Sequence, residues 1–68
     1  MKPYNETLTD MREWFRRWRS HIPAKDDGES WDRLVAEIRE IVPRGQVAIF
    51  INLVNRYIEM LEAQSNYP

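Results

Sequence analysis

Hydrophobic residues recur at intervals of three and four positions in three separate stretches of this chain. In the first stretch they are spaced 4-3-4-3-4, at Tyr4, Leu8, Met11, Phe15, Trp18 and Ile22. This is the period of an α-helix with one buried side, and Thr7 is a residue type suited to capping its amino terminus. Pro23 ends the pattern, because the residue before a proline avoids the helical conformation. The first stretch therefore predicts a helix over residues 7–21.

The other two stretches predict helices over residues 30–42 and 46–63, joined by a turn at Pro43 and Gly45. Ser30 is the expected amino-terminal cap of the second helix. The apolar positions of the third helix are Val47, Phe50, Ile51, Val54, Tyr57, Ile58 and Leu61. We therefore predict one all-α domain, residues 1–68, that forms a three-helix bundle with short connections and the third helix central.

The third helix is more apolar than such a bundle requires. Its apolar residues cover an arc of about 200°, whereas packing against two neighbours needs about half of that. The surplus consists of Ile49, Leu53 and Met60, and contiguous exposed apolar surface usually marks an interaction site. Trp14, on the edge of the first helix, is a candidate aromatic anchor beside this seam. We predict that the seam is an interface.

An alternative is that the seam is covered from within the chain. Long basic side chains, Trp14, or the terminal segments with Tyr4 and Tyr67 could fold over Ile49 and Leu53. Composition favours association instead. The chain has 68 residues, no cysteine and one histidine, so neither disulfides nor a metal can support its small core. Oligomerisation is the remaining common solution, and we predict a homodimer, a complex with another protein, or both.

The net charge of −1 does not suit a dedicated nucleic-acid-binding domain, which is usually strongly basic. Residues 1–22 nevertheless carry five Lys/Arg against three Asp/Glu. On the first helix Arg12, Arg16 and Arg19 form a ridge beside the core, which could contact an acidic partner or a phosphate backbone. The alternative is a solvated helix face on which Glu13 pairs with neighbouring arginines.

Residues with chemical potential are few. His21 has no nucleophile beside it and is expected to interact with the dipole at the end of the first helix. Asp26, Asp27 and Glu29 lie in a loop too short for an EF-hand. We expect no catalytic, cofactor-binding or metal site and no enzymatic activity.

The second and third helices resemble a helix-turn-helix unit only in outline. The exposed start of a recognition helix needs polar side chains, and here only Arg44 and Gln46 could reach bases. DNA reading by this unit is therefore not expected. The chain starts without a hydrophobic signal core, and the apolar run of residues 47–54 is too short to span a bilayer. We therefore expect a cytoplasmic protein.

Residues 30–38 (SWDRLVAEI) and 50–62 (FINLVNRYIEMLE) resemble segments of small uncharacterised proteins from phages and prophages of Gram-positive bacteria. Those proteins share a segment of the form aromatic-Trp/Leu-Val-x-Glu and a final helix that ends in a Tyr-Leu-Glu-Glu-like sequence. The resemblance covers about half of the chain, which departs from the group in its arginine-rich first helix and in Met60. It implies a phage accessory protein that binds a host protein, sometimes to block a defence system, and it assigns no functional residue.

The sequence thus predicts a non-catalytic interaction module that self-associates, occludes a host protein, or does both. The alternative function is nucleic-acid binding through the arginine ridge.

Overall fold

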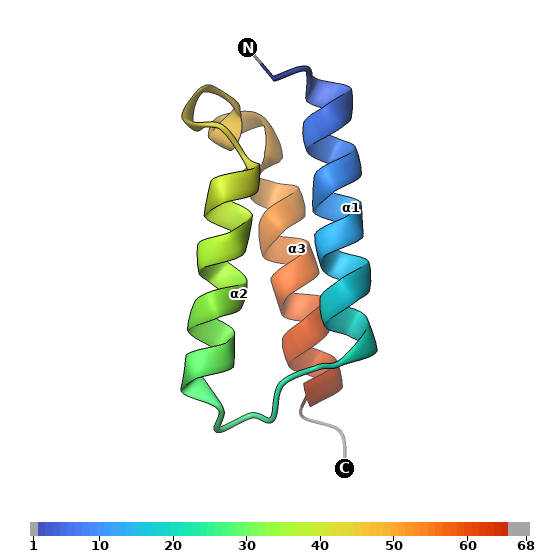
Figure 1. The fold of residues 1–68 in the computed structure, drawn as a ribbon, viewed down its shortest axis with the longest axis vertical. Helices are drawn as coiled ribbons and strands as arrows, with labels where there is room; N and C mark the ends of the chain where they lie inside the picture. The colour runs from blue at the N-terminus through green and yellow to red at the C-terminus, as the bar shows by residue number, and fades with distance from the viewer. Residues whose placement is uncertain (1, 66–68) are drawn as a thin grey trace.

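The computed structural model describes residues 2–65, so the predicted role of Tyr67 lies outside the described residues. It contains α1 (Tyr4–Ser20), α2 (Gly28–Ile41) and α3 (Val47–Ser65), and a short 3-10 helix η1 (Arg44–Gln46) leads directly into α3 (Figure 1). The predicted all-α three-helix bundle is therefore confirmed.

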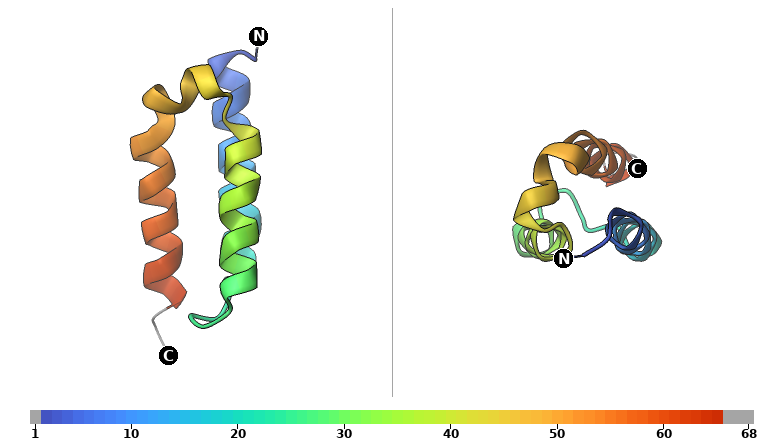
Figure 2. Two further views of the ribbon diagram at one scale, coloured as in Figure 1. Left: turned by 90° about the vertical axis from the view of Figure 1, so that its left-hand side faces the viewer. Right: turned by 90° about the horizontal axis from the view of Figure 1, so that it is seen from above.

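Successive helices run in opposite directions along a bundle about 41 Å long and 18 Å wide. Seen along this axis, the three helices stand at the corners of a triangle (Figure 2). The expectation of a central third helix is therefore corrected: α3 shares the core with α1 and α2 and keeps a large part of its own surface outside.

Two helices begin earlier than predicted because other residues cap them. Pro3 is the N-cap of α1, and its carbonyl accepts the backbone N–H groups of Glu6 and Thr7, both at 3.1 Å. Thr7, the predicted cap, is instead a helical residue that is completely buried.

Asp27, and not the predicted Ser30, caps α2. Its carboxylate accepts the backbone N–H of Ser30 at 3.2 Å and the hydroxyl of Ser30 at 2.7 Å. These two hydrogen bonds, helped by the charge of Arg33, lower the pKa of Asp27 below its ordinary value of 3.8.

The core lies along the long axis of the bundle, between the three helices, and all three contribute to it. Its buried apolar members are Met11, Trp14, Leu34, Ile38, Val42, Phe50, Val54 and Leu61. Trp14 is the largest of them, and its indole N–H donates to the carbonyl of Leu34 on α2 at 3.1 Å. A buried tryptophan needs such a partner for its N–H group.

The buried side of α1 is therefore rotated from the predicted stripe by about 50°, toward Trp14 and Thr7. Tyr4, predicted at the centre of the stripe, is 54% exposed. Leu8 and Phe15 are only partly buried. The rotation moves these three residues to the side of α1 that borders α3.

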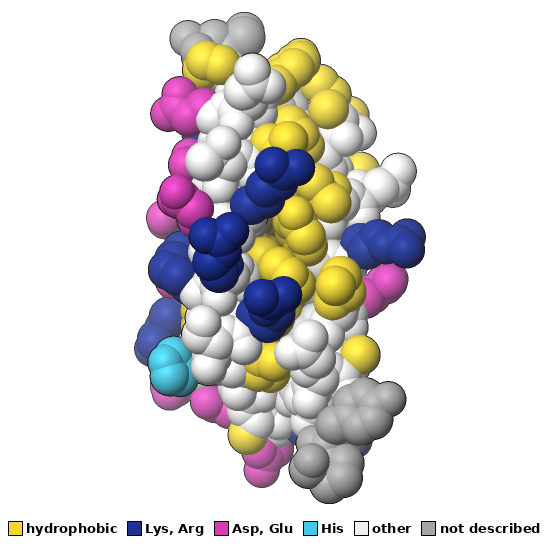
Figure 3. All heavy atoms as spheres, turned by 90° about the vertical axis from the view of Figure 1, so that its right-hand side faces the viewer, with side chains coloured by type: hydrophobic (Ala, Val, Ile, Leu, Met, Phe, Trp, Pro, Cys, Tyr) yellow, Lys and Arg dark blue, Asp and Glu magenta, His cyan; other side chains and the backbone are white. Residues whose placement is uncertain are grey.

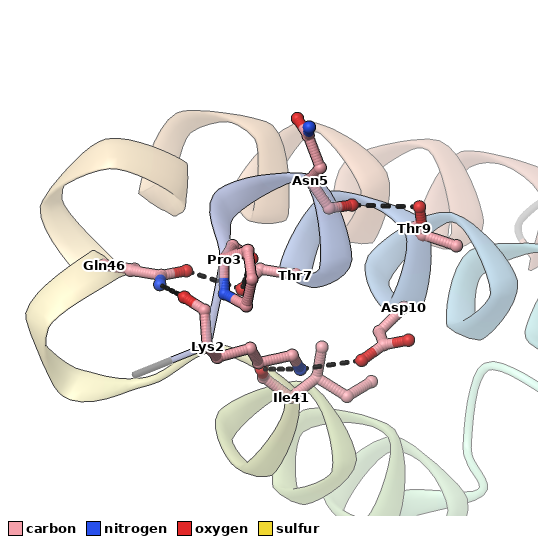
Figure 4. Close-up of polar contacts among 8 residues, drawn as sticks. All are labelled: Lys2, Pro3, Asn5, Thr7, Thr9, Asp10, Ile41 and Gln46. Carbon is pink, nitrogen blue, oxygen red and sulfur yellow. Dashed lines mark hydrogen bonds and ion pairs between the residues drawn. The ribbon is translucent and has the colours of Figure 1, made fainter.

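A polar joint formed by Lys2, Thr7 and Gln46 closes one end of the bundle (Figure 4). The Thr7 hydroxyl donates to Gln46 Oε1, and Gln46 Nε2 donates to the backbone carbonyl of Lys2. Lys2 Nζ donates to the carbonyl of Ile41 at 2.8 Å and forms an ion pair with Asp10 at 2.7 Å. The joint ties the start of α1 to the α2–α3 connection.

Candidate protein-interaction surface

An apolar stripe runs along the side of the bundle where α1 and α3 meet, and Lys/Arg side chains border and partly overlie it (Figure 3). We call this surface the α1/α3 face. It consists of Tyr4, Leu8, Phe15, Ile49, Leu53, Tyr57 and Met60, with Arg12, Arg16 and Arg19 at its α1 border.

The α3 half of the face contains the three residues predicted to form the seam. Ile49 is 53% exposed, Met60 is 45% exposed, and Leu53 is partly buried. Together with Tyr57 they follow one another at intervals of four, four and three positions, so they lie on one side of the helix. Within residues 2–65, the chain leaves Ile49 and Met60 largely uncovered.

The α1 half joins this stripe through an aromatic stack that sequence reasoning missed. The rings of Phe15 and Tyr57 have centroids 4.5 Å apart and planes only 18° from parallel. The sequence pattern predicts both side chains in the core, but the rotation of α1 moves Phe15 out to the rim. One feature of the sequence indicated this arrangement: Trp14 widens the apolar stripe of the first helix, so Trp14 and Phe15 compete for its buried side.

Trp14 does not belong to this surface, and its prediction as an interface anchor is wrong. Its side chain is 0% exposed, and its N–H group is bonded to the Leu34 carbonyl. Its ring lies 6.4 Å from that of Tyr57, on the inner side of the aromatic stack. The bulkiest residue on that part of α1 is therefore used for the core.

The three predicted arginines are brought together around the aromatic stack. Arg12, Arg16 and Arg19 line a shallow hollow of about 180 Å³ whose other walls are Phe15 and Tyr57. The guanidinium carbon of Arg19 lies 5.9 Å from the Phe15 ring centroid, within cation–π range.

These arginines have no ion-pair partner within residues 2–65. The two ion pairs of the described chain join Lys2 to Asp10 and Arg17 to Glu37. Glu13 therefore does not neutralise the ridge as the solvated-face alternative supposed. Three positive charges stand beside an uncovered apolar stripe.

A second apolar surface, not predicted, lies between α2 and α3. It is a groove of about 390 Å³ lined by Ile38, Val42, Val47, Ile51 and Val54, with Arg39 and Arg44 at its rim. Ile51 is 41% exposed there. The wide apolar arc of α3 has two edges, and the prediction from the sequence covers only the edge that carries Ile49 and Met60.

The remaining residues considered for chemistry lie at the end of α1, in the loop that follows it and in the first turn of α2. His21 is exposed directly after α1, where its backbone N–H caps the Trp18 carbonyl at 3.2 Å. Asp26 and Glu29 are also exposed. Among the described residues, no three His, Cys, Asp or Glu side chains come close enough together to hold a metal ion.

Gln46, considered as a base-reading residue, is buried in the polar joint. No helix within residues 2–65 combines the length and the apolar character needed to cross a bilayer. Compared with known proteins, the chain matches no family model, no curated protein and no solved structure.

Proposed function

We propose that this protein is a non-catalytic interaction module that uses its α1/α3 face to cover the surface of another protein molecule. The observation that carries the proposal is the exposure of Ile49 and Met60 beside the Phe15–Tyr57 stack. A contiguous apolar patch on a small protein marks an interaction site. Aromatic and arginine residues, which border this patch, are enriched among residues that dominate binding energy.

Two kinds of partner satisfy this proposal: a second copy of the chain, or a different protein. A core of this size rarely supplies more than about 3–5 kcal/mol of stability, so burial of the face adds to a small total. The resemblance to phage proteins supports the finer proposal that the chain occludes a host protein in the host cytoplasm, such as a component of a defence system.

Sedimentation velocity at micromolar concentration tests the self-association arm, with Ile49→Asp compared against Ile51→Asp. Both residues lie exposed on α3, but on opposite edges. Each substitution replaces an apolar side chain that is about half buried, so both variants should lose about 1 kcal/mol of folding stability. If the face binds a second copy, the native protein and Ile51→Asp should sediment as a species larger than one chain, and Ile49→Asp should sediment as a monomer.

Photo-crosslinking tests the other arm. A benzophenone side chain introduced at position 49 should form an adduct with the partner in a bacterial lysate, and the same group at position 51 should not. An excess of native protein should suppress the adduct, whereas an excess of Ile49→Asp should not. A monomer that gives no adduct from position 49 would refute the proposed function.

Nucleic-acid binding is the second candidate, because Arg12, Arg16 and Arg19 have no ion pairs within residues 2–65. The aromatic geometry is less favourable, since Phe15 and Tyr57 cover one face of each other and single-strand binding relies on stacking bases on free rings. Three phosphate contacts would give affinity for a single strand a salt slope of about −2 on logarithmic axes. No binding to RNA or DNA at low salt removes this candidate.

A further inference from the structure

The charges along the α1 border are arranged for a partner that supplies carboxylates. Arg12, Arg16 and Arg19 are exposed and spaced four and three positions apart, so they extend over about 10 Å along α1. No carboxylate within residues 2–65 forms an ion pair with them. Their positive charge is therefore available to whatever covers the apolar stripe.

The opposite border of the face does not offer the complementary charge. On α3 the exposed polar positions beyond Ile49 and Met60 are Asn52, Arg56 and Glu59, as follows from a turn of about 100° per residue. This border supplies one carboxylate and one further guanidinium.

A second copy is consequently a poor occupant. In a twofold dimer with unlike borders facing each other, three arginines meet one glutamate and another arginine. With like borders facing, six arginines meet. Juxtaposed like charges at an interface cost several kcal/mol.

We infer that the α1/α3 face binds an acidic amphipathic helix of a different protein, an inference that rests on the proposed function. The stripe follows the long axis of two adjacent helices, and Ile49 to Met60 span about 16 Å, or three helical turns. A partner helix places apolar side chains on this stripe and carboxylates at the spacing of the three arginines. Charge-assisted hydrogen bonds from arginine to carboxylate fix its register.

The probe is a fluorescein-labelled helical peptide with leucines at helical spacing and glutamates on both flanks, compared with the same peptide carrying glutamines. Fluorescence anisotropy measures both affinities. The native protein should bind the glutamate peptide about tenfold more tightly at low salt, as expected for a few exposed ion pairs. The difference should shrink at ~0.15 M salt, where exposed charges are largely screened.

Two triple variants with equal net charge locate the effect. Arg12→Gln/Arg16→Gln/Arg19→Gln should abolish the preference for the glutamate peptide. The control Arg33→Gln/Arg39→Gln/Arg44→Gln, which changes α2 and η1 instead, should retain it. Ile49→Asp should weaken binding of both peptides.

Each contrary outcome is informative about a different step. The inference of an acidic helix would be overturned by equal affinity for the two peptides or by no binding of either. It would also be overturned if both triple variants lost the preference for the glutamate peptide equally. Self-association that depends on Ile49 and is unaffected by the peptide would identify a second copy, and the proposed function would stand. Displacement of the peptide by single-stranded DNA would overturn the proposed protein-interaction function in favour of nucleic-acid binding. Absence of self-association, crosslinking and peptide binding would remove the proposed function as well.

Discussion

The buried hydrogen bond between Thr7 and Gln46 joins α1 to η1, and a double-mutant cycle measures its contribution. Thr7→Val keeps the shape of the side chain but leaves Gln46 Oε1 without its donor. Gln46→Leu leaves the Thr7 hydroxyl with the Pro3 carbonyl at 3.4 Å, which is too long for a strong hydrogen bond, and frees the Lys2 carbonyl.

The expected size follows from the burial of both residues, 0% exposed for Thr7 and 3% for Gln46. A buried polar group without a partner costs about 1–3 kcal/mol. Each single variant should therefore lower the free energy of unfolding by about 2 kcal/mol, which lowers Tm by about 8–16 °C in a domain of this size. The double variant removes both groups, so its loss should be about 1–2 kcal/mol smaller than the sum of the single losses.

Urea unfolding followed by circular dichroism supplies the four free energies. Thr9→Val is the matched control, because the Thr9 hydroxyl bonds the Asn5 carbonyl at 2.9 Å on an exposed part of α1. Its change should be about 0.5 kcal/mol or less. Strictly additive losses, or a Gln46→Leu variant as stable as the native protein, would refute the role of the pair in holding the bundle closed.

Two further substitutions examine the core and the cap. Trp14→Phe removes the hydrogen bond to Leu34 and part of a fully buried side chain, so thermal unfolding should show a loss of about 1–3 kcal/mol; an unchanged Tm would contradict a core built around Trp14. The hydrogen bonds from Ser30 lower the pKa of Asp27, so its stabilising charge is fully present above pH 3.8 and is lost as the pH falls through the lower folded-state pKa. Native stability should therefore decline more steeply in acid than that of Asp27→Asn, and parallel pH profiles would argue against the cap.

Helical periodicity was sufficient to predict three helices and their connections, because apolar spacing and the stops at Pro23 and Pro43 are local signals. It was not sufficient to predict how α1 is turned. The rotation depends on partners far along the chain: Trp14 bonds a carbonyl 20 positions away, and Thr7 bonds a side chain 39 positions away. Such pairings leave no trace in the spacing of one helix.

The surface was predictable to a similar degree. The excess arc of α3 led to Ile49 and Met60, both of which are exposed. Leu53 is partly buried, because it packs against the core. The aromatic stack and the second groove depend on the relative placement of helices, which amphipathic patterns of single helices do not contain.

The rotation of α1 has a consequence for how substitutions in this protein are interpreted. Because Trp14 occupies the core, Phe15 and Leu8 are displaced outward. A buried residue therefore determines which side chains of α1 reach the α1/α3 face. A smaller residue at position 14 would allow α1 to rotate toward the predicted orientation, and Phe15 and Leu8 would then move from the α1/α3 face into the core. In an alanine scan, Trp14 would then register as a binding determinant although it touches no partner, and an unfolding measurement beside the binding assay separates such indirect effects from true contacts.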